Sequence, residues 1–224
     1  MTYRWSEGAA HILSLFAPWS EGDGFEESVV RNVEENLGLR FPLRLRNFYL
    51  FWGKRKDITR SNQIFLEPDE TFIHHNHLVI CIENQAVEYF GIPIDRLSEG
   101  NPPVDWIYND EDTEWKPSHK QLTTFMDSLF YHHAFCGGAV HSAFVRIYEN
   151  HERIENMIEL NYQRISLDCI PWYIHPGEDY SPWLLYTHPG LVIDPFWGVS
   201  AVASTLEALQ ELENKIEIKW DKIS

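Results

Sequence analysis

The sequence predicts an α+β fold in which helices flank one central sheet of mixed or antiparallel strands. In some segments apolar residues recur every three or four positions, as on the buried face of a helix. In others they alternate with polar residues or form short runs, as in strands. No repeat, low-complexity tract or long linker divides the 224 residues. We therefore expect an irregular lead-in over residues 1–24 and a single domain over residues 25–224.

Two helices are predicted after the lead-in. The first begins near Phe25, carries a stripe of valines and ends at Gly38, a residue type that commonly stops a helix. The second has Pro42 in its first turn, where the missing N–H costs no hydrogen bond, and it ends at Gly53.

From Gln63 onward the spacing is that of strands, which we expect at residues 64–66, 72–82 and 86–92. The turn Glu83-Asn84-Gln85 joins the last two, and its polar side chains are expected to satisfy backbone groups. Cys81 lies inside an apolar run and is predicted to be a small core residue.

The rest of the chain predicts both helices and strands. A helix capped by Ser118 and Gln121 should run to Gly137. The later elements are a helix at 149–161, strands at 183–186 and 191–193 joined by the turn His188-Pro189-Gly190, a helix from Thr205 capped by Ser204 and Glu207, and a short terminal strand at 216–220.

The charge is strongly negative and unevenly spread. The chain carries a net charge of −16, and residues 61–115 hold 12 acidic residues against one basic residue, Arg96. Nucleic acids and anionic membrane surfaces are disfavoured as partners, because both attract a basic face. A basic protein is the expected partner, since opposite electrostatic fields speed association.

Cysteine usage and hydropathy bear on the compartment. The three cysteines, Cys81, Cys136 and Cys169, form no CxxC motif, so neither a disulfide framework nor a zinc site is indicated. The N-terminus does not read as a signal peptide, and no apolar run approaches the roughly 18 residues needed to cross a bilayer. We expect a reduced, cytoplasmic protein without a cofactor.

Several motifs, in this order, resemble the SUKH superfamily. They are ENLGLRFPLRLRNFYLFWG at residues 35–53, Glu83-Asn84-Gln85, Phe90-Gly91-Ile92, Asn101-Pro102-Pro103-Val104 with Trp115, and the segment at residues 201–220. The similarity spans about residues 30–221. The chain departs from the pattern at Phe90, where Trp is usual, at Asn101, where Asp is common, and in the loop at residues 54–61.

The resemblance implies an α+β fold with a central mixed sheet, and no enzymatic activity. Bacterial members of the superfamily are widely associated with polymorphic toxin systems, where they act as immunity proteins that bind and neutralise a cognate toxin, in many cases a nuclease. Fungal relatives regulate cell-wall synthesis through protein partners.

The segment DWIYNDEDTE at residues 105–114 is the predicted binding loop, because it combines five acids with two aromatic side chains. A solvated loop with Trp106 packed inward is the alternative. The predicted contact residues are Asp105, Trp106, Tyr108, Asp110, Glu111, Asp112 and Glu114, with Glu67, Asp69 and Glu70 adjacent to them.

Histidines supply the remaining candidates for chemistry. If His74-His75-Asn76-His77 lies on a strand, His75 and His77 share one face, and a metal would need a third ligand such as Glu88, Asp69 or Glu70. A polar strand edge is the favoured interpretation.

A second histidine pair ends the predicted helix before Gly137. His132 and His133 are expected to be cationic there and to complement the helix dipole. Cys136 is near them, but a helix end gives no reason for an aligned Cys–His pair.

Three functions follow for the chain. The first is an immunity protein that occludes a basic toxin, the second is a scaffold or regulator with another protein partner, and the third is a histidine-dependent metalloenzyme.

Overall fold

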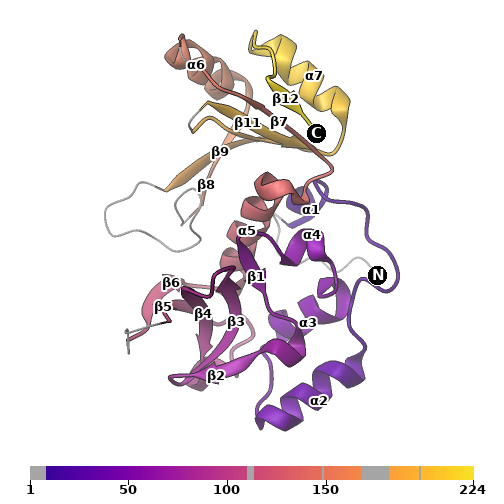
Figure 1. Ribbon diagram of the computed structural model, residues 1–224, viewed down its shortest axis with the longest axis vertical. Coiled ribbons are helices and arrows are strands. Elements are labelled where there is room, and N and C mark those ends of the chain that lie inside the picture. The colour runs from indigo at the N-terminus through magenta and orange to yellow at the C-terminus, as the bar shows by residue number, and fades with distance from the viewer. Residues whose placement is uncertain (1–8, 110–113, 148, 168–181, 197) are drawn as a thin grey trace.

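A computed structural model describes the chain except residues 1–8, 110–113, 148, 168–181 and 197. The described residues form two antiparallel sheets of six strands each, with helices between them and beyond the second (Figure 1). The predicted α+β class is confirmed, but the sequence led us to expect one central sheet where the structure has two. The prediction of one domain over residues 25–224 stays a prediction.

The first sheet has the strand order β1-β3-β4-β5-β6, and β2 pairs with β3 beside this path. Its strands are β1 (Gln63–Phe65), β2 (Phe72–His74), β3 (His77–Glu83), β4 (Glu88–Pro93), β5 (Val104–Tyr108) and β6 (Lys116–His119). Consecutive strands pair in this sheet, so most of it is built from local hairpins.

The second sheet has the order β12-β7-β11-β10-β9-β8. Its strands are β7 (His141–Val145), β8 (Gln163–Leu167), β9 (Trp183–His188), β10 (Leu191–Asp194), β11 (Val199–Ala203) and β12 (Lys222–Ile223). The pairing of β7 with β11 joins segments more than fifty residues apart, from Val145 opposite Val199 to His141 opposite Ala203.

The helices that precede β7 in the chain lie between the two sheets and beside the first (Figure 1). They are α1 (Ala9–Leu13), α2 (Glu27–Leu37), α3 (Leu43–Trp52), α4 (Lys56–Thr59) and α5 (Leu122–His133), and a π-helical turn, η3 (Ala134–Gly138), follows α5. Their buried side chains, such as Phe48 and Phe125, form one core with the inner faces of both sheets. The second sheet contributes side chains from β8, β9, β10 and β11 to this shared core: Leu167, Trp183, Leu185, Val192 and Val202.

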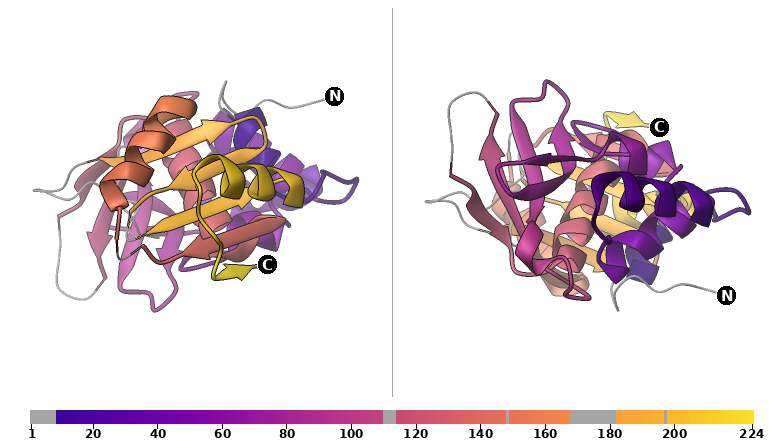
Figure 2. Two further views of the ribbon diagram at one scale, coloured as in Figure 1. Left: turned by 90° about the horizontal axis from the view of Figure 1, so that it is seen from above. Right: turned by 90° about the horizontal axis from the view of Figure 1, so that it is seen from below.

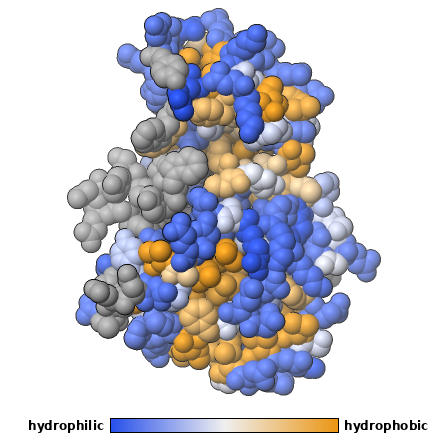
Figure 3. All heavy atoms as spheres, viewed as in Figure 1, coloured by the Kyte–Doolittle hydropathy of each residue, from blue (hydrophilic) through white to orange (hydrophobic). Residues whose placement is uncertain are grey.

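The outer face of the second sheet is covered by α6 (His151–Asn161) and α7 (Leu206–Lys215), which lie over its strands in Figure 2. Ile158 of α6 and Leu212 of α7 are fully buried in a second apolar cluster with Ile193 and Ala201 of the sheet. On the side seen in Figure 3, hydrophilic side chains cover most of the α6–α7 end, while hydrophobic ones reach the surface in the half that holds the first sheet.

The sequence predicted an irregular lead-in over residues 1–24, but part of this segment is helical. Residues 1–8 lie outside the described part, but α1 begins at Ala9, and Ile12, Leu15 and Phe16 are buried in the shared core. The predicted stops of the next two helices are confirmed. Gly38 has a φ of 67° and caps α2, because a glycine adopts this left-handed conformation without steric cost.

The strand predicted over residues 72–82 is interrupted. His75 and Asn76 have φ angles of 41° and 63° and form a two-residue turn between β2 and β3. A hairpin turn of this type needs positive φ at both central residues, which asparagine tolerates better than most side chains. His74 and His77 therefore face each other across the hairpin, and His75 lies in the turn.

Both predicted capping boxes are wrong in detail. Ser118 belongs to β6, where its hydroxyl lies 2.8 Å from Nδ1 of His119, and Gln121 precedes α5 without a capping bond from its side chain. At α7 the cap is Thr205, whose hydroxyl accepts a hydrogen bond from the N–H of Ala208.

The segment predicted as a terminal strand instead packs back on α7. The backbone N–H of Trp220 donates to the Glu213 carboxylate, and its indole N–H donates to the carbonyl of Leu209. The terminal strand is β12, two residues further on, which pairs with Phe144 and Ala143 of β7.

His132 and His133 are buried, whereas the sequence predicted cationic side chains that complement the helix dipole. Burial lowers the pKa of His133 to about 4, against the opposing effect of hydrogen bonds with the carbonyls of Ile58 and Gln63. His133 thus joins α5 to α4 and β1 as a neutral core residue, because desolvation outweighs these hydrogen bonds and the charge of Asp57.

Candidate partner-binding surfaces

The segment predicted as an acidic loop begins as a strand. Asp105, Trp106 and Tyr108 all belong to β5, while Asp110, Glu111 and Asp112 lie outside the described residues and Glu114 is exposed. The loop prediction is wrong for the first half of the segment, because its charged residues concealed the alternation of Val104 and Trp106 with Asp105 and Ile107.

Alternation along β5 sends the predicted contact residues to opposite faces. Trp106 pairs with Phe90 across the strands and lies in the shared core, with 7% of its surface exposed. The ammonium of Lys116 lies 5.1 Å from the ring centre of Trp106 and 5.5 Å from that of Tyr108. Asp105 points to the other face of the sheet, so these residues do not form one contact surface.

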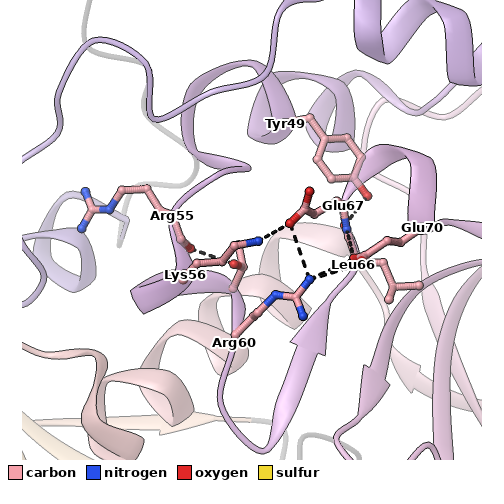
Figure 4. Close-up of polar contacts among 8 residues, drawn as sticks. Tyr49, Arg55, Lys56, Arg60, Leu66, Glu67 and Glu70 are labelled. Carbon is pink, nitrogen blue, oxygen red and sulfur yellow. Dashed lines mark hydrogen bonds and ion pairs between the residues drawn. The ribbon is translucent and has the colours of Figure 1, made fainter.

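The second predicted group of acids is largely neutralised by nearby bases (Figure 4). On the short helix η1 (Pro68–Glu70) and the residue before it, Glu67 contacts the ammonium of Lys56, and Glu70 lies 3.1 Å from the guanidinium of Arg60. The hydrogen bond from Lys56 is the main reason that the pKa of Glu67 is lowered. Asp69 is exposed beside them.

The outer face of the first sheet carries a group of rings that sequence reasoning did not bring together. We call Phe72, His74, His77, Tyr89 and Trp115 the aromatic–histidine patch. Cross-strand pairs define the face, since partners in an antiparallel sheet point to the same side: Phe72 pairs with Val79, and Val79 with Gly91.

Contacts within the aromatic–histidine patch are close. The rings of Phe72 and Tyr89 meet edge to face at 5.5 Å, and Tyr89 meets His74 at the same distance. The imidazole of His77 stacks on Trp115 at 4.1 Å, and its Nε2 lies 3.1 Å from the Asp105 carboxylate. Partial burial and the neighbouring histidines lower the pKa of His74.

Gly91 makes room for this stack. A Cβ atom there would lie 2.8 Å from the ring of Trp115, so any side chain would displace the tryptophan. The sequence signal for the aromatic–histidine patch was therefore period-2 spacing on three neighbouring strands, which becomes visible only once the strand pairing is known.

The histidines do not form the metal site that one hypothesis requires. His75 lies in the turn, and Glu88 points to the opposite face of the sheet from His77. Within the described part of the chain, no group of three or more His, Cys, Asp and Glu side chains is arranged to hold a metal ion.

In the turn Glu83-Asn84-Gln85 the side chain that bonds to the backbone is that of Glu83. The sequence had predicted this role for the side chains of Asn84 and Gln85. The Glu83 carboxylate accepts a hydrogen bond of 2.8 Å from the N–H of Gln85. Ala86 follows with a φ of 58°, and the side-chain amide of Asn109 donates to its carbonyl.

Cys136 and His132 lie at an enclosed cavity of about 40 Å³ between η3 and the second sheet. Asp194, Trp183 and Ser200 also line it, and the Cys136 sulfur is 3.8 Å from Nδ1 of His132. Burial raises the pKa of the Cys136 thiol to about 11, so the thiol stays protonated and is a weak nucleophile. Cys81 is fully buried, as predicted.

Comparisons with protein-family models, curated proteins and solved structures give no match to the chain. The SUKH resemblance therefore stays a prediction. Among the residues that the structure describes, every helix is too short or too polar to span a bilayer.

Proposed function

We propose that this protein is a non-catalytic binding protein whose partner is a basic protein, and that the partner is a toxin that it neutralises by occlusion. The observation that carries the proposal is the aromatic–histidine patch on the outer face of the first sheet. No described helix packs over this face, since the buried side chains of α1 to α5 belong to the core on its other side.

The composition of the patch supports a binding role. Aromatic side chains supply large contact area at a small cost in conformational entropy, and they are enriched where protein partners meet. Phe72, Tyr89 and Trp115 are each half-buried, so part of every ring remains accessible. Asp105, which contacts His77, and the exposed Glu114, which precedes Trp115 in the chain, provide acidic groups at the margin of the patch.

The sign of the charge supports a basic partner. The net charge of −16 creates a field that attracts cationic surfaces and raises the rate of encounter. Because Lys56 and Arg60 already pair with Glu67 and Glu70, the attraction must come from the remaining acids of the molecule. The choice of a toxin as the partner comes from the SUKH resemblance alone.

Co-expression tests the proposal. Cells that express each toxin encoded beside this gene should survive when the protein is co-expressed, and Tyr89→Ala should remove the protection. Glu207→Gln on α7, an exposed position on the opposite end of the molecule, is the control and should protect as well as the wild type.

Two outcomes would overturn the proposal. One is that no neighbouring toxin is neutralised. The other is that affinity purification from the native host recovers a cell-wall or signalling protein that binds through the patch, which would favour a scaffold function.

A further inference from the structure

A polar hollow of about 390 Å³ opens at one end of the first sheet, away from the aromatic–histidine patch. The residues that line it come from the start of β1 and from the hairpin between β3 and β4. They are Asn62, Gln63, Glu83, Asn84, Gln85, Val87 and Glu88.

The strand register places the side chains of Gln63, Glu83 and Glu88 on the face of the sheet that the helices cover. Gln63 pairs with Glu83 and is two residues from Phe65, while Glu88 is two residues from Phe90 on β4. Phe65 and Phe90 are both core residues, and side chains two apart in a strand share a face. The hollow is therefore an extension of the core face beyond the end of the apolar core.

Its floor contains buried hydrogen-bond acceptors. Gln63 is 2% exposed and Glu88 is 5% exposed. Among the described residues no donor reaches Oε1 of Gln63. A buried acceptor without a donor costs about 1–3 kcal/mol, so a ligand that donates to this oxygen gains that stabilisation. The backbone carbonyl of Gln63 is already bound to His133, which leaves the side chain as the group that faces the hollow.

Among the residues that the structure describes, the lining is rich in acceptors and contains two carboxylates, Glu83 and Glu88, but no lysine, arginine or histidine. The basic residues Lys56 and Arg60, which precede β1, contact Glu67 and Glu70 and do not donate to Oε1 of Gln63 (Figure 4). A ligand that complements the hollow must therefore be cationic and must carry several N–H donors.

We propose that this hollow binds the guanidinium group of an arginine side chain. A guanidinium presents five N–H donors in one plane, and it sheds water more readily than an ammonium, which has only three donors. These donors match acceptors that converge from separate strands, the amide oxygen of Gln63 and the carboxylates of Glu83 and Glu88. That the arginine belongs to a basic protein partner rests on the proposed function, whereas the preference for guanidinium rests on the hollow itself.

Titration of the whole ¹⁵N-labelled protein with N-acetyl-arginine amide, followed by NMR, tests the inference. We expect chemical-shift changes at the backbone amides of the lining residues, with a Kd on the order of 1 mM, as befits one side chain. N-acetyl-citrulline amide has the same shape without the charge and should bind at least about tenfold more weakly, the ratio that corresponds to 1.4 kcal/mol.

Three variants locate the binding group. Glu83→Gln keeps an acceptor for the Gln85 N–H but removes the charge, and it should weaken binding about tenfold. Gln63→Met removes the buried acceptor, so it should weaken binding without lowering the urea midpoint. Asp69→Asn removes the same charge from an exposed site outside the hollow and should leave the Kd within about twofold.

The inference is overturned if no lining amide shifts at tens of millimolar probe, if the citrulline probe binds equally well, or if Asp69→Asn weakens binding as much as Glu83→Gln. Neutralisation of a toxin without probe binding would overturn this inference and leave the proposed function standing. Probe binding without neutralisation of any toxin would support the hollow as a guanidinium site and overturn the proposed function.

Discussion

The two sheets both turn one face toward the shared core, yet their outer faces are covered differently. The outer face of the second sheet lies beneath α6 and α7, whose Ile158 and Leu212 are fully buried against it. On the outer face of the first sheet, half-buried rings take the place of a helix, and they contact one another instead of an apolar layer.

The outer face of the first sheet can stay without a covering helix because the sheet is antiparallel. Antiparallel sheets can leave one face to solvent when that face is polar or small in apolar area. On the first sheet Val79 and Ile107 are fully buried although neither belongs to the shared core, and their cross-strand partners are Phe72 and Tyr89. The difference indicates that burial on the second outer face stabilises the fold, and it underlies the proposal that the first outer face binds a partner.

Truncating the covered face should have the largest effect. Leu212→Ala removes a fully buried side chain from the cluster under α7 and should lower the free energy of unfolding by about 2–5 kcal/mol. Tyr89→Ala on the first sheet removes a half-buried ring and should cost less, about 1–2 kcal/mol. Urea denaturation of both variants measures the two costs. Equal costs would mean that the aromatic–histidine patch is structural, and the contrast between the sheets would fail.

Substitution of Asp194, which lies on the inner face of the second sheet, should have the next largest effect on stability. Burial raises the pKa of this carboxyl from 3.8 to about 6, despite a hydrogen bond from the N–H of Phe196. The folded state therefore holds the proton more tightly than the unfolded state. Stability from this group is present below about pH 4 and is lost as the pH rises to about 6.

Asp194→Asn removes this titration. At pH 7 the variant should be more stable than the wild type by up to about 3 kcal/mol, and the difference should vanish near pH 4. Urea midpoints across this pH range measure it, with Asp221→Asn, an exposed carboxylate on the same half, as the control. A difference that does not change with pH would contradict the buried, raised pKa.

Local chemistry in the sequence predicted the elements whose ends and faces depend only on neighbours along the chain. Gly38 marked the end of α2, and the turn His188-Pro189-Gly190 marked the hairpin of β9 and β10. The second sheet was missed as a separate sheet because its centre depends on the pairing of β7 with β11. That contact is remote in sequence, and no local pattern encodes it.

The candidate sites also combine features that local sequence predicts with features that depend on strand pairing. Acidic composition located the segment at residues 105–114, but it did not show that Asp105 and Trp106 point to opposite faces of a strand. The turn at His75-Asn76 contains no glycine, so the strongest hairpin signal was absent. Gln63 gave no signal at all, since a buried glutamine with an unbonded oxygen is a property of the folded chain.

The smallest effects come from polar side-chain contacts on each outer face. On the first sheet, His77 binds Asp105 at 3.1 Å across two strands, and on the second, the Tyr186 hydroxyl donates at 2.8 Å to Glu159 of α6. Tyr186→Phe removes one hydrogen bond, and His77→Gln removes the ring contacts with Asp105 and with the carbonyl of His75. Each variant should lower the free energy of unfolding by about 0.5–1.5 kcal/mol, the net strength of ordinary hydrogen bonds at partly exposed sites.

The two variants differ in which outer face they disturb. If the first outer face is the binding surface, His77→Gln weakens protection in the co-expression assay, since it loosens the stack on Trp115, while Tyr186→Phe leaves protection unchanged. Matched losses of stability make this pair informative, because any general effect of destabilisation acts on both. Loss of protection in both variants, or in Tyr186→Phe alone, would mean that the covered and uncovered faces do not divide stability from binding.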